Sequence, residues 1–305
     1  MSEKILQAYS SIRNANFVEA KKILNSALVF ELNNDELLFA MNCCDFWIDV
    51  IARSESIGDH FERGEIFIDE WKSFQDFLRR KEKIFERTLF AVKVGIFSLA
   101  LRHYNQAEEK GKARKAKIQR GIGLCYKKLG EYETALACLR EALSLKNDSA
   151  SIIAEAADCY ALCAKPREAK ILFREAFFVD AQKIELDFLD SEEINCLVKI
   201  VEEKGYVGAE LLEWIPVYGQ LCGIFNVKRK LTQPEVAHLN RKIYAAETEM
   251  KNPSCQSKIL IPRLINMYFW MIDFYVSAGK KTQEVNELLV RMKILDTEIY
   301  EIYVK

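Results

Sequence analysis

The stretch GLCYKKLGEYETALACLREALSL, residues 123–145, recurs 34 residues later in an altered form. Cys-Tyr at 125–126 aligns with Cys-Tyr at 159–160, and Arg-Glu-Ala at 140–142 aligns with the same three residues at 174–176. Small residues also align, Gly123 with Ala157, Ala135 with Ala169 and Gly130 with Ala164. An internal repeat of this length predicts a structural unit that buries its apolar face against neighbouring units.

Each copy has the pattern of two antiparallel helices joined by a tight turn. The small residues allow the two backbones to approach closely, and larger side chains fill the remaining space between helices. Gly130 stands where the first helix must stop, a position that favours left-handed backbone geometry. The large residues are Tyr126, Leu139, Tyr160 and Phe173.

The period and this arrangement of small and large residues resemble the tetratricopeptide repeat (TPR) family. The resemblance implies an all-α fold, a right-handed α-solenoid of antiparallel helix pairs, here of roughly fourteen helices. It also implies a protein-binding scaffold or adaptor that holds a partner peptide or helix in a concave groove. Residues 116–183 are predicted to form two tandem units.

The flanking regions resemble the repeat less closely. Residues 1–115 are predicted to be a degenerate TPR-like region, and residues 184–305 a helical C-terminal region with a closing helix over Thr282–Tyr303. Within residues 1–34, five residues indicate a degenerate unit, namely Ala15, Phe17, Ala20, Leu24 and Ala27. Their spacing matches that of Gly130, Tyr132, Ala135, Leu139 and Ala142. An aromatic stripe, Phe67, Trp71 and Phe74, is expected in the core. The apolar segment 89–101 needs burial on nearly all sides.

Composition narrows the functional class. The net charge of −1 gives no general attraction to nucleic acid or anionic membranes, and only 12 glycines and 5 prolines suit a helical chain. The nine cysteines lie mostly in apolar helical patterns, which favours core packing in a reducing compartment. The start of the sequence lacks an export signal pattern, so we expect a cytoplasmic protein.

The segment Cys255–Gly279 is long and apolar, but Lys258, Arg263 and Asp273 make a membrane span costly. We therefore expect a buried helix, packed within one chain or across a homodimer.

No pattern of catalytic residues stands out. The three histidines, His60, His103 and His238, lie in distant segments without metal-ligand spacing, and no phosphate-binding glycine loop occurs. We expect no enzyme activity, no cofactor and no metal site.

The basic stretch Lys110–Arg120 has two interpretations. It is either a solvent-exposed loop with the start of a helix, or one end of a groove for an acidic or carboxylate-bearing partner. From the family geometry, the candidate groove residues are Lys117, Arg120, Leu124, Lys127, Ser151, Ala154 and Asp158. Leu124 stands where chaperone-binding members of the family carry an asparagine, so that particular ligand is not implied. The alternative function is RNA or DNA binding through Lys110–Arg120, which the near-neutral charge makes the weaker hypothesis.

Overall fold

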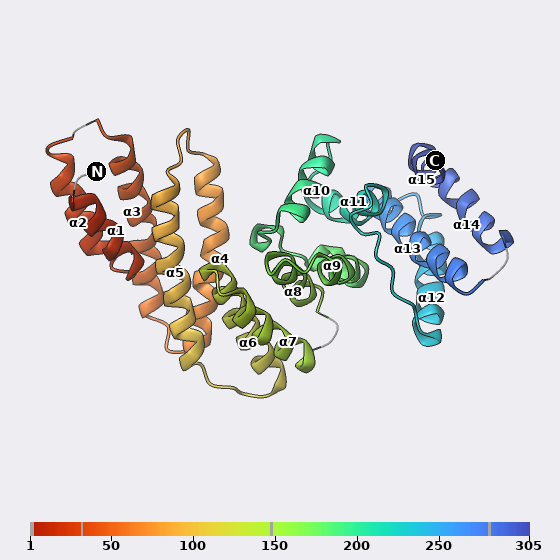
Figure 1. Cartoon of the computed structure of the whole chain (residues 1–305), viewed down its shortest axis with the longest axis horizontal. Coiled ribbons are helices and arrows are strands. Elements are labelled where there is room, and N and C mark those ends of the chain that lie inside the picture. The colour runs from red at the N-terminus through yellow and green to blue at the C-terminus, as the bar shows by residue number, and fades with distance from the viewer. Residues whose placement is uncertain (1–2, 32, 147–148, 280–281) are drawn as a thin grey trace. The chain divides into compact units, whose positions relative to one another are not determined.

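The computed structural model describes residues 3–31, 33–146, 149–279 and 282–305 and is all-α (Figure 1). These ranges contain fifteen α-helices and two short 3₁₀ helices, which confirms the predicted fold class of packed helix pairs. The chain forms two compact units, Met1–Asn147 and Asp148–Lys305. The division falls between the two tandem units predicted over residues 116–183.

The first unit consists of seven helices in its described residues. They are α1 (Glu3–Arg13), α2 (Phe17–Leu28), α3 (Asp35–Glu55), α4 (His60–Arg79), α5 (Glu86–Gln106), α6 (Lys112–Leu129) and α7 (Tyr132–Leu145). Consecutive helices pack against each other, and α1 also packs against α5. That contact is close because a Cβ atom on Gly95 of α5 would lie 2.1 Å from the carbonyl oxygen of Ile12.

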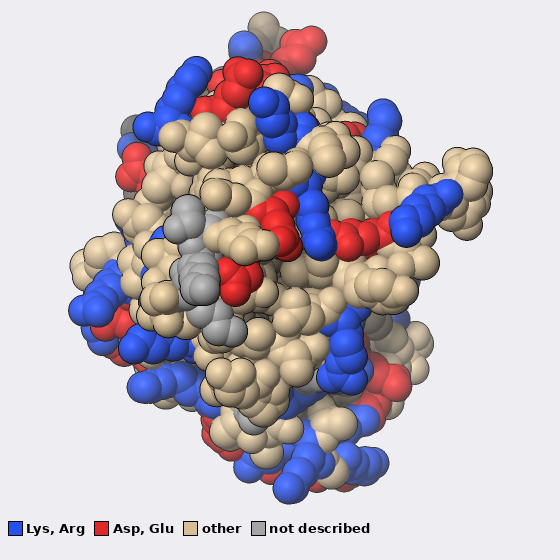
Figure 2. Space-filling view, turned by 90° about the vertical axis from the view of Figure 1, so that its right-hand side faces the viewer, with Lys and Arg blue, Asp and Glu red and all other residues tan. Residues whose placement is uncertain are grey.

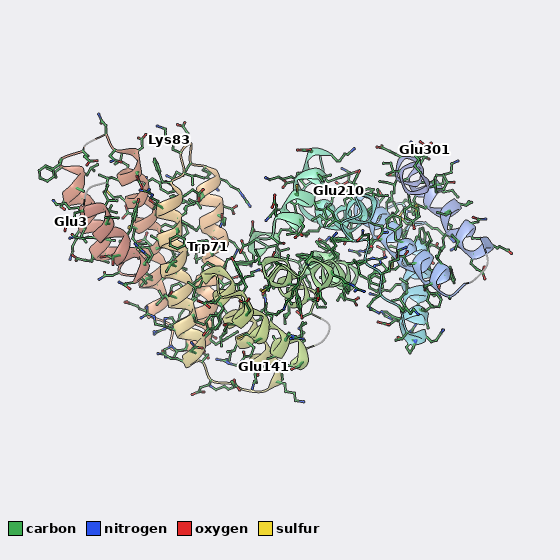
Figure 3. The ribbon with its side chains drawn as sticks, in the orientation of Figure 1. Glu3, Trp71, Lys83, Glu141, Glu210 and Glu301 are labelled. Carbon is green, nitrogen blue, oxygen red and sulfur yellow. The ribbon has the colours of Figure 1, made fainter. Side chains whose placement is uncertain are left out.

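Aromatic side chains fill the space between α3, α4 and α5. Trp71 of α4, labelled in Figure 3, meets Phe97 of α5 edge to face with ring centroids 4.8 Å apart. It also lies beside Trp47 of α3 at 6.1 Å. Phe67, Trp71 and Phe74 are all buried, so the predicted core role of the aromatic stripe is confirmed.

The second unit is also helical throughout its described residues. Its α-helices are α8 (Ala150–Leu162), α9 (Pro166–Asp180), α10 (Glu192–Glu203), α11 (Gly208–Leu221), α12 (Gln233–Glu249), α13 (Ser257–Ser277), α14 (Thr282–Leu295) and α15 (Thr297–Val304). The 3₁₀ helices η1 (Ala181–Lys183) and η2 (Leu186–Phe188) connect α9 to α10. Helix α13 packs against α11, α12 and α14.

Helix α13 is, among the described residues, the one helix long and apolar enough to cross a membrane, and 67% of its most apolar window is buried. Its Asp273 is buried and forms ion pairs with Arg174 of α9 and with Lys228. Arg174 also lies 4.4 Å from the centre of the Trp270 ring. Because its carboxylate finds cations within the chain, α13 packs as a core helix, as expected from the sequence.

The same turn joins the helices of three pairs, α1–α2, α6–α7 and α8–α9. Gly130 after α6 has a φ of 90°, and the aligned residues Ala15 and Ala164 have φ values of 59° and 56°. In each turn this residue donates its N–H to the carbonyl three residues back, and the next residue donates to the carbonyl five residues back, at 2.8–3.0 Å. This is the Schellman pattern that ends a helix with a left-handed residue. The three stretches aligned by sequence therefore share one local structure.

The predicted closing helix is two helices rather than one. Helix α14 ends at Leu295, and the Asp296 side chain accepts a hydrogen bond from the Ile299 backbone N–H at 2.9 Å to begin α15. An aspartate that caps the N-terminus of a new helix competes with continuation of the old one. Met292 and Ile299 are buried, whereas Ile302 near the end of α15 is 40% exposed.

Candidate functional site

The α6–α7 pair forms the repeat from which the site was predicted. A Cβ atom on Gly123 would lie 2.8 Å from Cγ of Leu139 and 3.1 Å from the carbonyl oxygen of Ala135. Ala135, Leu139 and Ala142 of α7 are fully buried. The small residues therefore permit the close helix approach that the sequence predicted.

Helix α6 carries four of the seven candidate groove residues. Lys117 is exposed and Arg120 partly exposed, whereas Leu124 and Lys127 are each 1% exposed. A buried lysine cannot meet a partner without a change in the surrounding structure. Of these four, Lys117 and Arg120 are the ones available at the surface.

A carboxylate on the neighbouring helix α4 lies close to both of these cations. Burial raises the pKa of Glu65, and the positive charges of Arg120 and Lys117 act against that rise. The Tyr104 hydroxyl donates a hydrogen bond to the same carboxylate. The predicted basic end of the groove is therefore partly neutralised within the first unit.

Helix α8 of the second unit carries the other three candidates. Ser151 is partly exposed, with its hydroxyl 3.2 Å from that of Ser149, and Ala154 is buried. Asp158 is buried, and its carboxylate accepts backbone hydrogen bonds from Asp190 and Ser191 at 2.8–3.1 Å. These groups precede α10, so Asp158 holds the start of that helix. Whether the seven residues share one groove remains a prediction, because they belong to two separately described units.

Three cations of the basic stretch, Lys110, Arg114 and Lys115, pair with carboxylates of the first unit. Arg114 donates two hydrogen bonds to the Asp59 carboxylate, at 2.6 and 2.5 Å, and thereby lowers the pKa of Asp59. The other pairs are Lys110 with Glu108 at 2.9 Å and Lys115 with Glu109 and Glu141 at 3.3 and 3.1 Å. The stretch is therefore a network of ion pairs more than a uniform basic stripe.

The second basic run, at 228–230, is paired as well. Arg229 donates to both carboxylate oxygens of Glu175, at 2.6 and 2.8 Å, and to Glu235 at 2.7 Å. The Arg229 guanidinium lowers the pKa of Glu235 to about 2.

Two of the three histidines meet, contrary to their expected separation. The Nδ1 atoms of His60 at the start of α4 and His103 near the end of α5 lie 3.0 Å apart. Their rings stack, and His103 also stacks on Phe67. This contact could have been predicted from the sequence. Antiparallel pairing of two consecutive helices of about twenty residues places the start of one beside the end of the other. Among the described residues, no group of three potential metal ligands gathers.

An apolar groove that no sequence pattern predicted lies between α1 and α5. It has a volume of about 510 Å³, and the residues that line it are Leu6, Tyr9, Arg13, Glu86, Arg87, Phe90 and Ala91. Leu6 is 51% exposed and Phe90 is 55% exposed. Phe90 belongs to the segment 89–101 that was expected to be buried on nearly all sides, so this expectation was wrong at its N-terminal end.

The tetratricopeptide repeat model matches residues 116–149, which include most of α6 and all of α7. This chain contains a tetratricopeptide repeat. A search of curated proteins found no match to it. Lys117, Arg120, Leu124 and Lys127 lie within the matched repeat, and the α1–α5 groove lies outside it in the same compact unit.

Proposed function

We propose that this TPR protein is a non-enzymatic scaffold that binds an acidic amphipathic helix of a partner protein in the groove between α1 and α5. The tetratricopeptide repeat supports a role in protein–protein interaction in general. The observation that carries the more specific proposal is the exposed apolar lining of the groove, above all Phe90 and Leu6.

The groove has the features of a helix-binding surface. Exposed apolar side chains that gather in one groove are a common feature of partner-binding surfaces. A helix lays its apolar face into such a groove through residues three and four positions apart. Two arginines, Arg13 and Arg87, line the groove together with one glutamate, Glu86. The excess of positive charge favours a partner helix with acidic residues beside its apolar face.

The concave surface predicted from the repeat is a second candidate for contact with the same class of partner. Lys117 and Arg120 are the residues of α6 that support it, because they reach the surface. Leu124, Lys127, Ala154 and Asp158 are buried and do not enter this proposal.

Nucleic-acid binding is the less favoured function. Several cations of the basic runs at 110–120 and 228–230 pair with carboxylates, which weakens the attraction of these runs to phosphates. On the face shown in Figure 2, Lys and Arg are interspersed with Asp and Glu. An affinity for nucleic acid that falls steeply with salt would instead favour this alternative.

Two further parts of the proposal concern chemistry and location. His60 and His103 contact each other and Phe67, an arrangement that supports a packing role more than catalysis.

All nine cysteines are thiols in the described chain, which supports a cytoplasmic location.

Affinity capture with quantitative mass spectrometry tests the proposal. We expect Phe90→Asp to lose the captured partner while the circular-dichroism melt is unchanged, because the side chain is already exposed. Ile294→Asp is the matched control, since Ile294 of α14 is 79% exposed and lies outside the groove. If only the double variant Lys117→Ala/Arg120→Ala loses the captured partner, binding is assigned to the α6 surface. Identical capture by all three variants would refute both surfaces.

A further inference from the structure

A cavity of about 360 Å³ lies within the second unit, between α9, α11, α12 and α13. Its apolar walls include Phe177, Phe178, Leu260 and Met267. Its volume falls within the range of small-ligand pockets, which are mostly apolar with a few well-placed polar groups. The polar groups here decide what it could bind.

Glu213 of α11 offers one unused hydrogen-bond acceptor to the cavity. The side chain is 4% exposed, and its Oε1 atom accepts from Gln182 at 2.9 Å and from two nitrogens of Arg263. Its Oε2 atom accepts no hydrogen bond from the described residues. A buried carboxylate usually engages both of its oxygens.

Asn266 of α13 is a second polar side chain without an intrachain partner. It is 8% exposed and lines the cavity, and its amide forms no hydrogen bond with the described part of the chain. The amide can therefore form new hydrogen bonds with a ligand in the cavity.

The charged side chains of the lining balance one another. Three carboxylates, those of Asp180, Glu213 and Glu249, face two cations, Lys242 and Arg263. Asp180 also pairs with Lys183 at 2.9 Å, outside the lining. Lys242 lies 5.9 Å from the centre of the Phe178 ring. Two acceptors without an intrachain hydrogen bond, Oε2 of Glu213 and Oδ1 of Asn266, suit a positively charged hydrogen-bond donor.

We propose that this cavity is a binding site for a guanidinium or primary ammonium group on an alkyl stem. The cationic group donates hydrogen bonds to Glu213 Oε2 and Asn266 Oδ1, and the stem packs against Phe178 and Met267. Two sources share this chemistry: an arginine or lysine side chain of a partner protein, and a small polyamine. The site is separate from the α1–α5 groove, and neither proposal depends on the other.

Titration of the full chain with small probes, followed by two-dimensional NMR, tests the assignment. The probes are N-acetyl-arginine amide, N-acetyl-lysine amide, spermidine and N-acetyl-citrulline amide, the neutral isostere of the first. We expect the cations to bind about tenfold more tightly than the citrulline probe. Tighter binding of the amino-acid amides than of spermidine would identify a partner side chain as the ligand, and the reverse order a polyamine. Absence of binding by every cation at about 10 mM would overturn the proposal.

Variants separate a binding role of Asn266 from a structural one. Asn266→Ala removes no intrachain side-chain hydrogen bond, so we expect an unchanged or raised melting temperature together with about tenfold weaker binding of the cationic probes. Asn240→Ala, on the exposed side of α12, is the matched control and should bind like the parent. Glu213→Gln should reduce the preference for arginine over citrulline. Equal binding by Asn266→Ala and the parent would contradict the site.

Discussion

Tyr104 is the side chain at which α4, α5 and α6 meet. It is 1% exposed, and two glycines make room for its ring. A Cβ atom would lie 2.9 Å from the ring on Gly64 and 2.4 Å from it on Gly121. The ring therefore occupies space that any larger residue at these positions would need.

Gly121→Ala should destabilise the first unit. The added methyl group overlaps the Tyr104 ring, and overpacking of this kind costs about 1–3 kcal/mol. The free energy of unfolding in urea measures the loss. Gly58→Ala is the control, because a Cβ atom there meets no atom within 4 Å. Equal stability of the two variants would show that Tyr104 is not held between the helices as described.

His103 should make the first unit sensitive to pH. Burial, His60 and the nearby Arg63 and Arg102 lower the pKa of His103 from 6.5 to about 4. Between these values the unfolded chain binds a proton that the folded chain does not, so the free energy of unfolding falls as pH falls from about 6.5 to 4. Below pH 4 this contribution is constant.

The matched variant for this prediction is His103→Gln. We expect its unfolding free energy to depend less on pH between 6.5 and 4 than that of the parent. His238→Gln, at an exposed position of α12, should retain the parental dependence. If His103→Gln has the same pH profile as the parent, then the histidine pair does not govern this dependence.

Individual side-chain positions were the part of the site that sequence predicted least well. Helical spacing made Asp158 a candidate for the groove, but it could not show that backbone N–H groups 32 and 33 residues later would meet its carboxylate. The exposure of Phe90 depends in the same way on how much of α5 the neighbouring helices cover. Such contacts are set by tertiary packing rather than by local pattern.

Helix pairs and their turns were predicted much better, because the signals are local. The alignment of Ala15 and Ala164 with Gly130 already implied three equivalent turns, and all three have a left-handed residue at this position. The closing segment failed for an equally local reason. Its apolar spacing continued past Asp296, and a cap within a periodic segment divides it into two helices.

The turns give a prediction about stability. An alanine held in the left-handed region costs about 1–2 kcal/mol. A glycine avoids this cost but loses more conformational entropy on folding, so its net advantage is smaller. We expect Ala164→Gly to stabilise the protein by about 0.5–1 kcal/mol, and Gly130→Ala to destabilise it by a similar amount. Gly130 has no atom within 4 Å of an added Cβ atom, so the backbone conformation alone accounts for the effect. Chemical denaturation with the same sign for both changes would contradict the shared turn.

At the scale of the molecule, two compact helical units carry different kinds of surface. The first contains the tetratricopeptide repeat and an exposed apolar groove with two arginines. The second contains a pocket lined by apolar side chains and by charged side chains of both signs. Composition alone does not reveal how charged and apolar side chains are distributed between these two surfaces.

Hydrogen–deuterium exchange of the chain alone and in complex with its captured partner tests the proposed binding most directly. We expect new protection in α1, residues 3–13, and in the N-terminal half of α5, residues 86–96, because a bound helix covers their exposed face. Protection confined to other helices, with none in these two segments, would contradict partner binding in the α1–α5 groove.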